Sequence, residues 1–234
     1  MRAQTLPAVA GWRWIGAGFL IFRRNPMLYS MLVVSYWFTV IFLNVLPVLA
    51  SLLIPGLSVG LMQAARTLER GQPVGLQTLY GGLKQNTRTL VGLGALYLCC
   101  TVGIIGVSAL FDGGDLVRYM MASNRLEQAA VEDADFTVSA LVVMMLLVPL
   151  MMAYWFAPML AAWHRLSIGK SLFFSFVACL MNWRPFLTYS AGLLLVAGIV
   201  PGILLGFLIG LFPGGQSFAT GLIMVPMILV IAPA

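Results

Sequence analysis

The chain has 234 residues, of which 61% are hydrophobic and only 9% are charged. A soluble domain carries about 25% charged and about 45–50% apolar residues, so this composition excludes a soluble globular protein. The apolar runs lack the two-residue alternation of membrane strands, which excludes an outer-membrane barrel. The fold class expected is therefore an all-α, polytopic membrane protein.

Six apolar segments are long enough to cross a bilayer core of about 30 Å. They are expected at about 27–46, 48–65, 89–111, 137–163, 185–211 and 218–234. Short turns such as Asn44 to Pro47 join them in pairs, which predicts three antiparallel hairpins. The chain stops at Ala234 in apolar sequence without a basic tail, and this favours a truncated C-terminus.

A shorter amphipathic segment precedes each expected hairpin, and its apolar residues recur at helical spacing. This pattern is typical of a helix that lies in the membrane interface. The three apolar faces are Trp12, Ile15, Phe19 and Phe22; Leu76, Leu79, Tyr80 and Leu83; and Ile168, Leu172, Phe173, Phe176, Val177 and Leu180, the last opposite a narrow polar face of Ser171 and Ser175.

An asparagine closes each of these segments and precedes a span: Asn25, Asn86 and Asn182. Asparagine is a favoured helix cap, so the order of features predicts one integral membrane domain, 1–234, of three repeat-like units at about 12–66, 74–163 and 168–234. Sequence identity between the units is slight. The alternative stays open that any membrane protein built from hairpins has such capping residues between its helices.

The charges predict the orientation. The 13 basic residues and seven acidic residues divide unequally between the two sides of the proposed spans, and positively charged loops stay in the cytoplasm. Both termini are therefore expected in the cytoplasm, and the loop 112–136 in the periplasm. The cytoplasmic side has only Glu69 against Arg2, Arg13, Arg23, Arg24, Arg66, Arg70, Lys84, Arg88, Arg165, Lys170 and Arg184.

Basic and aromatic residues at the ends of the surface helices are candidate contacts to lipid, because anionic headgroups attract Lys and Arg. Alternatively, these helices only anchor the hairpins. Because the net charge of +6 is spread through short loops beside apolar runs, no nucleic-acid partner is expected. The candidate lipid contacts are Trp12, Arg13, Arg23, Arg24, Lys84, Arg88, Lys170, Trp183 and Arg184.

The sequence contains no recognisable set of catalytic residues. No charged residue falls in the middle of a span, which counts against a proton-driven pump, and His164 has no carboxylate or second ligand nearby in sequence. The three cysteines lie in apolar stretches and lack metal-ligand spacing. We therefore expect no enzymatic activity, no cofactor and no metal.

Small residues mark a candidate packing face on the fifth span: Gly198, Gly202, Gly206 and Gly210. Glycines at four-residue spacing let another helix approach closely, from this chain or from a partner protein. Proline and glycine also interrupt several spans, at Pro55-Gly56, Pro149, Pro158, Pro201-Gly202 and Pro226. Such breaks form transporter sites in some proteins, but they also serve as kinks and packing positions.

Three motifs carry a resemblance to a known family: G-W-R-W with F-R-R-N-P, then L-I-P-G-L-S-V-G-L-M, then E-R-G-Q-P-V. They resemble an uncharacterised family of six-span proteobacterial inner-membrane proteins and, more loosely, the membrane domain attached to some glycerophosphodiester phosphodiesterases. The resemblance implies a fold and an inner-membrane location, without an activity or functional residues. Members usually continue into a short polar tail that this sequence lacks.

Together these features predict a non-enzymatic inner-membrane protein that serves as an accessory, scaffold or assembly subunit of a larger membrane complex. The partners expected are membrane lipids and another inner-membrane protein. The alternative is a transporter or lipid-handling protein that uses the interrupted spans.

Overall fold

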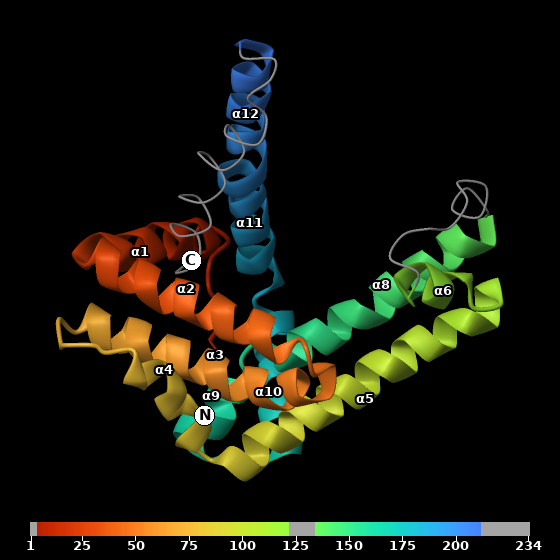
Figure 1. Cartoon of the computed structure of the whole chain (residues 1–234), viewed down its shortest axis with the longest axis horizontal. Coiled ribbons are helices and arrows are strands. Elements are labelled where there is room, and N and C mark those ends of the chain that lie inside the picture. The colour runs from red at the N-terminus through yellow and green to blue at the C-terminus, as the bar shows by residue number, and fades with distance from the viewer. Residues whose placement is uncertain (1–3, 122–133, 212–234) are drawn as a thin grey trace. The chain divides into compact units, whose positions relative to one another are not determined.

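A computed structural model describes residues 4–121 and 134–211, and within these ranges every regular element is a helix (Figure 1). The all-α prediction is therefore confirmed for the described residues. In chain order the helices are α1 (Ala10–Arg24), α2 (Pro26–Leu43), α3 (Pro47–Glu69), α4 (Gln77–Gly81), η1 (Gly82–Lys84), α5 (Thr87–Asp112), α6 (Asp115–Met121), α8 (Ala134–Tyr154), α9 (Ala157–His164), α10 (Ile168–Met181), α11 (Trp183–Leu193), the π-helical turn η2 (Leu194–Ile199) and α12 (Val200–Leu211).

Five helical segments of the described chain are long and apolar enough to cross a membrane, and they coincide with the first five expected spans. Many of their large apolar side chains are exposed, as expected for helices surrounded by lipid rather than water; Leu110 is 82% and Met145 78% exposed. The sixth expected span, 218–234, lies outside the described residues. The five segments are Pro26–Leu43, Pro47–Glu69, Thr87–Asp112, Phe136–His164 and Trp183–Phe207.

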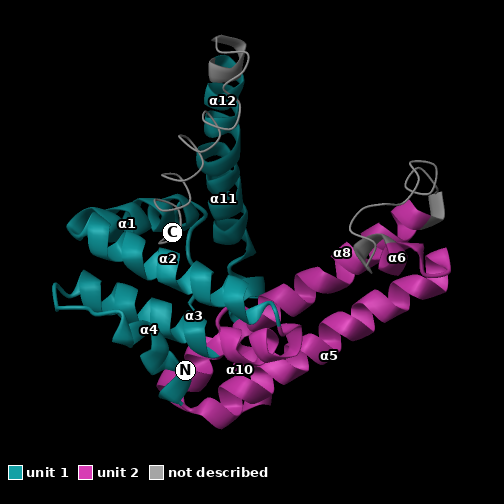
Figure 2. Cartoon of the chain, viewed as in Figure 1, with its two compact units in different colours: residues 1–45, 56–85, 178–234 teal, residues 46–55, 86–177 magenta. Residues whose placement is uncertain are grey.

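The described chain divides into two compact units (Figure 2). Unit 1 comprises residues 1–45, 56–85 and 178–234, and unit 2 comprises residues 46–55 and 86–177. Two of the borders fall inside the helices α3 and α10. The three repeat-like units expected from the sequence stay a prediction.

In unit 1, α1 packs along α11. Gly11 lies so close to α11 that a Cβ there would collide with the Pro185 carbonyl oxygen, and Gly192 of α11 lies directly under the rings of Trp12. Trp14 adds edge contacts to Phe186 and Tyr189, with centroids 5.6 and 6.0 Å apart. The first surface helix is therefore held against the protein by one face, and this packing uses the G-W-R-W motif.

A second close approach joins α3 to the segment that follows it. A Cβ on Gly60 would collide with the Leu79 carbonyl oxygen, and one on Gly82 with the Gly56 carbonyl oxygen. The helix α3 continues through Pro55, and Gly56 lies close against Leu83.

In unit 2, α5 and α8 run side by side (Figure 1). The Tyr154 hydroxyl donates to the Leu93 carbonyl at 3.1 Å, and the Ser139 hydroxyl donates to the Ser108 carbonyl at 3.2 Å. Buried polar groups in a spanning bundle need such partners, because lipid supplies none.

Two surface helices differ from the sequence expectation. The second is only the five-residue α4 followed by the three-residue η1, with Leu79 buried; glycines at 75, 81 and 82 weaken helix formation there. The third, α10, buries Ser171 and Ser175 completely and exposes Phe173. Its polar face is thus turned into the protein, the reverse of a helix whose polar face meets water.

Candidate membrane and partner surfaces

The three recurring asparagines occupy equivalent N-cap positions, before α2, α5 and α11. Asn25 caps its helix, since its side-chain oxygen accepts from the Leu28 N–H at 3.1 Å. Asn86 instead donates to the Ala161 carbonyl at 2.9 Å. The Asn182 amide accepts from the Leu6 N–H at 2.8 Å and donates to the Gln4 carbonyl at 3.0 Å, which ties the N-terminal segment to the start of α11.

The candidate lipid contacts are all exposed: Trp12, Arg13, Arg23, Arg24, Lys84, Arg88, Lys170, Trp183 and Arg184. Two of them pair a cation with a ring, Arg23 over Phe19 at 6.0 Å and Arg184 over Trp183 at 5.4 Å. Such pairs suit an interface in which one end of the side chain is apolar and the other is wet. Trp12 has a second role, because it also covers Gly192.

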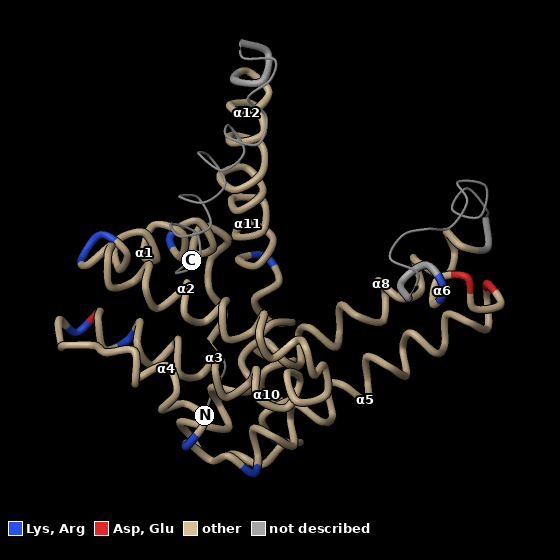
Figure 3. Tube along the Cα trace, in the orientation of Figure 1, with Lys and Arg blue, Asp and Glu red and all other residues tan. Residues whose placement is uncertain are grey.

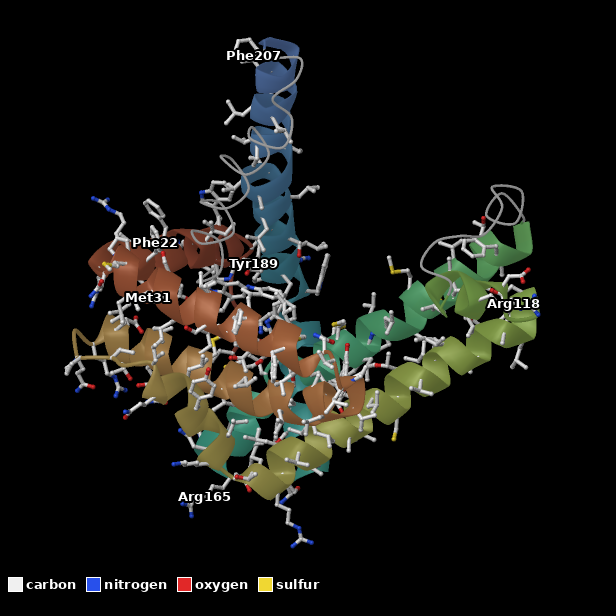
Figure 4. The ribbon with its side chains drawn as sticks, in the orientation of Figure 1. Phe22, Met31, Arg118, Arg165, Tyr189 and Phe207 are labelled. Carbon is white, nitrogen blue, oxygen red and sulfur yellow. The ribbon has the colours of Figure 1, made fainter. Side chains whose placement is uncertain are left out.

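The described charges lie at helix ends rather than along spans (Figure 3). Arginines occupy the ends of α1 and α3 in unit 1, whereas Asp112 and Asp115 lie where α5 meets α6 in unit 2. Asp112 is structural, since its carboxylate accepts from the N–H groups of Gly114 and Leu116, both at 2.9 Å. Arg118, labelled in Figure 4, forms an ion pair with Asp115 at 2.9 Å.

The glycine stripe lies on the surface of η2 and α12. An added Cβ would meet nothing within 4 Å at Gly202 or Gly206, and at Gly198 it would meet only Leu194 of the same helical segment. Gly210 belongs to the last turn of α12. Ile203, Leu204 and Phe207 are exposed around the stripe. No described helix occupies this face, and residues 212–234 lie outside the description.

The fourth span contains a site that the sequence analysis missed. The helix is interrupted at Trp155 and Phe156, between α8 and α9, because Pro158 has no N–H to bond the Tyr154 carbonyl. The Ser175 hydroxyl of α10 accepts from the Phe156 N–H and donates to the Met152 carbonyl, both at 2.9 Å. In an unbroken helix these two backbone groups would bond each other, so Ser175 stands in place of one helical hydrogen bond.

The fifth span is distorted differently. The turn η2 is π-helical, and the Val200 N–H bonds the Leu195 carbonyl. Pro201 follows directly, and a wider turn before a proline makes room for its ring. By contrast, Pro149 lies within the continuous α8. Pro226 falls outside the described residues.

Within the described ranges, no group of three or more His, Cys, Asp or Glu side chains comes together in a way that could hold a metal ion. His164 ends α9 and is exposed. The site is therefore described best as two kinds of surface, one basic and aromatic, the other apolar and glycine-rich.

No family model matches the chain, and no solved structure matches it. It is 34% identical over 241 residues to a probable inner membrane protein of Burkholderia thailandensis, and the alignment covers 99% of this chain and 88% of that protein. No link to glycerophosphodiester phosphodiesterases is found. The chain is thus an inner-membrane protein with helical apolar spans, and it belongs to the family of this Burkholderia thailandensis protein.

Proposed function

We propose that the protein is a non-enzymatic accessory or scaffold subunit, which binds another inner-membrane protein through the glycine-rich face of α12. One observation carries the proposal: a Cβ added at Gly202 or Gly206 would meet nothing within 4 Å, while Ile203 and Phe207 beside them are 67% and 65% exposed. Small residues flanked by large apolar ones form a surface into which a second helix fits.

The proposed topology places both termini in the cytoplasm, with six spans arranged as three hairpins and with membrane lipids around the basic ends. Support comes from the unequal distribution of charge and from the exposed arginines at the ends of α1 and α3. In this orientation the turn between α5 and α6 faces the periplasm.

A transporter or lipid-handling role is the second candidate, and the interrupted fourth span favours it. Interrupted helices bind substrates through freed backbone groups. At this interruption, however, Ser175 bonds both the Phe156 N–H and the Met152 carbonyl. Because these groups already have partners, the interruption supports packing of α10 better than it supports a substrate site.

Photo-crosslinking in intact cells tests the leading proposal. A photoreactive residue at Ile203 is expected to give a discrete adduct with one other inner-membrane protein, and the adduct is expected to disappear with Gly206→Leu. The matched control places the same residue at Phe38, which is 71% exposed but belongs to α2. Mass spectrometry of the gently extracted protein identifies the partner.

The proposal is contradicted if Ile203 links only to this chain's own residues 212–234, or to no protein. A lone chain that carries one defined lipid through extraction would favour lipid handling instead.

A further inference from the structure

Four arginines from two segments distant in sequence meet at one corner of unit 1. Arg23 and Arg24 end α1, while Arg66 lies in the last turn of α3 and Arg70 follows the end of that helix, with its N–H bonded to the Arg66 carbonyl at 3.3 Å. The Arg24 guanidinium donates to the Glu69 carbonyl oxygen, which brings the two helix ends together. Figure 3 shows the same gathering of basic residues at these ends. We call Arg23, Arg24, Arg66 and Arg70 the arginine corner.

The corner has a fixed framework beneath it. Tyr29, Val33 and Leu68 form a buried cluster, against which Ile21, Phe22, Leu28, Ala65 and Val74 pack. Phe22 meets Tyr29 edge-on at 6.4 Å between centroids. Because α1, α2 and α3 all contribute to this cluster, the helix ends that carry the arginines are held together by packing as well as by the Arg24 bond.

Charge at the corner is unbalanced, with four guanidinium groups and one carboxylate, that of Glu69. Some of this charge compensates the carbonyl ends of α1 and α3. Arg23 and Arg70 are both exposed. Guanidinium groups bind phosphate well, because their planar donors match its oxygens.

An exposed apolar stripe begins beside the arginine corner and runs along α2. Met27, Met31, Val34 and Phe38 lie at helical spacing on one face, and Met27 is 77% exposed. Met31 of this stripe is labelled in Figure 4. A basic corner joined to an apolar stripe matches a molecule with a phosphate at one end and hydrocarbon at the other.

We propose that the arginine corner binds the phosphodiester headgroup of an anionic phospholipid, with an acyl chain along Met27, Met31, Val34 and Phe38. This site is independent of the glycine-rich face of α12 and does not rest on the proposed scaffold function. The apolar stripe favours a lipid over free phosphate, which would gain nothing from it.

Native mass spectrometry and thermal unfolding of the purified, full chain in detergent test the site. The probes are dioleoyl phosphatidylglycerol, dioleoyl phosphatidylcholine and inorganic phosphate. Phosphatidylglycerol alone is expected to remain bound and to raise the unfolding midpoint. Arg23→Gln combined with Arg70→Gln is expected to weaken this binding about tenfold or more, because each removes an attraction to anionic headgroups.

The matched control is Arg118→Gln combined with Arg165→Gln, which removes the same charge. Both arginines are exposed, and neither belongs to the candidate lipid contacts. We expect this control to bind phosphatidylglycerol within about twofold of the native protein. Neither pair includes Arg24, whose bond to Glu69 holds the helix ends.

Circular dichroism of both variants checks that they fold. If the double variant does not fold, Arg70→Gln alone replaces it, since Arg70 lies beyond the end of α3. The proposal is overturned if phosphatidylcholine or inorganic phosphate gives the same shift. It is equally overturned if the corner variant binds as tightly as the control.

Discussion

At the scale of single residues, glycine has two distinct uses in this chain. Gly11, Gly60 and Gly192 allow neighbouring backbone or rings to approach, whereas Gly202 and Gly206 lie open within the described structure. Both kinds occur in apolar helices. The two kinds differ in whether another part of the chain packs against them. Of these five, only Gly11, Gly60 and Gly192 therefore contribute to the packing of the described fold.

Gly60→Ala is expected to lower the stability of the protein by about 1–3 kcal/mol, because the new methyl group would collide with the Leu79 carbonyl and backbone cannot rotate away. Thermal unfolding in detergent measures the effect. Gly106→Ala is the control, since Gly106 lies inside α5 and a Cβ added there would meet nothing within 4 Å. The Gly106→Ala variant is expected to have unchanged or slightly higher stability. Equal losses in both variants would contradict the close packing of α3.

At the scale of elements, the interrupted fourth span depends on its neighbour α10. That helix has 14 residues and a length of about 21 Å, too short for a bilayer core of about 30 Å. It buries two serines instead of presenting them to water. The role that the structure supports for α10 is thus to satisfy the backbone of the adjacent span.

Ser175→Ala is expected to cost about 1–3 kcal/mol of stability, because the Phe156 N–H and the Met152 carbonyl each lose their partner. The measurement is again the thermal unfolding midpoint in detergent. Ser171→Ala makes a matched control: Ser171 lies one turn earlier on the same helix and is equally buried, but its hydroxyl has no hydrogen-bond partner in the described structure. If both alanines have the same effect, Ser175 does not bridge the interruption.

At the scale of the whole molecule, the distribution of charge is the dominant feature. The basic residues border apolar spans, and the described acidic residues other than Glu69 lie at the junction of α5 and α6 or, in the case of Asp135, near the start of α8. Lipid bilayers retain positive loops on the cytoplasmic side. The orientation that we propose rests on this distribution of charge, which no single helix determines.

Reporter fusions measure that orientation. A reporter inserted after Gly75 is expected to be active only as a cytoplasmic enzyme, and one after Asn124 only as a periplasmic enzyme. Protease digestion of the untagged chain in intact spheroplasts provides an independent check. Cleavage is expected only in the loop 112–136. The opposite pattern in both assays would overturn the charge-based orientation.

Local signals in the sequence predicted much of this fold. Hydropathy over some 20 residues located five spans, and Asn25 with Pro26 marked the start of α2, because such properties depend on near neighbours alone. The candidate lipid contacts are exposed in the described structure. Whether they touch lipid stays a prediction.

The sequence by itself thus determined the class of protein and the position of its described spans, since the exclusion of charge from hydrocarbon acts on each segment separately. Only the tertiary structure decided which glycines are packed, which face of α10 is buried, and that Arg24 meets Glu69. These depend on contacts between residues far apart in the chain, such as Ser175 with Met152, for which no local pattern exists.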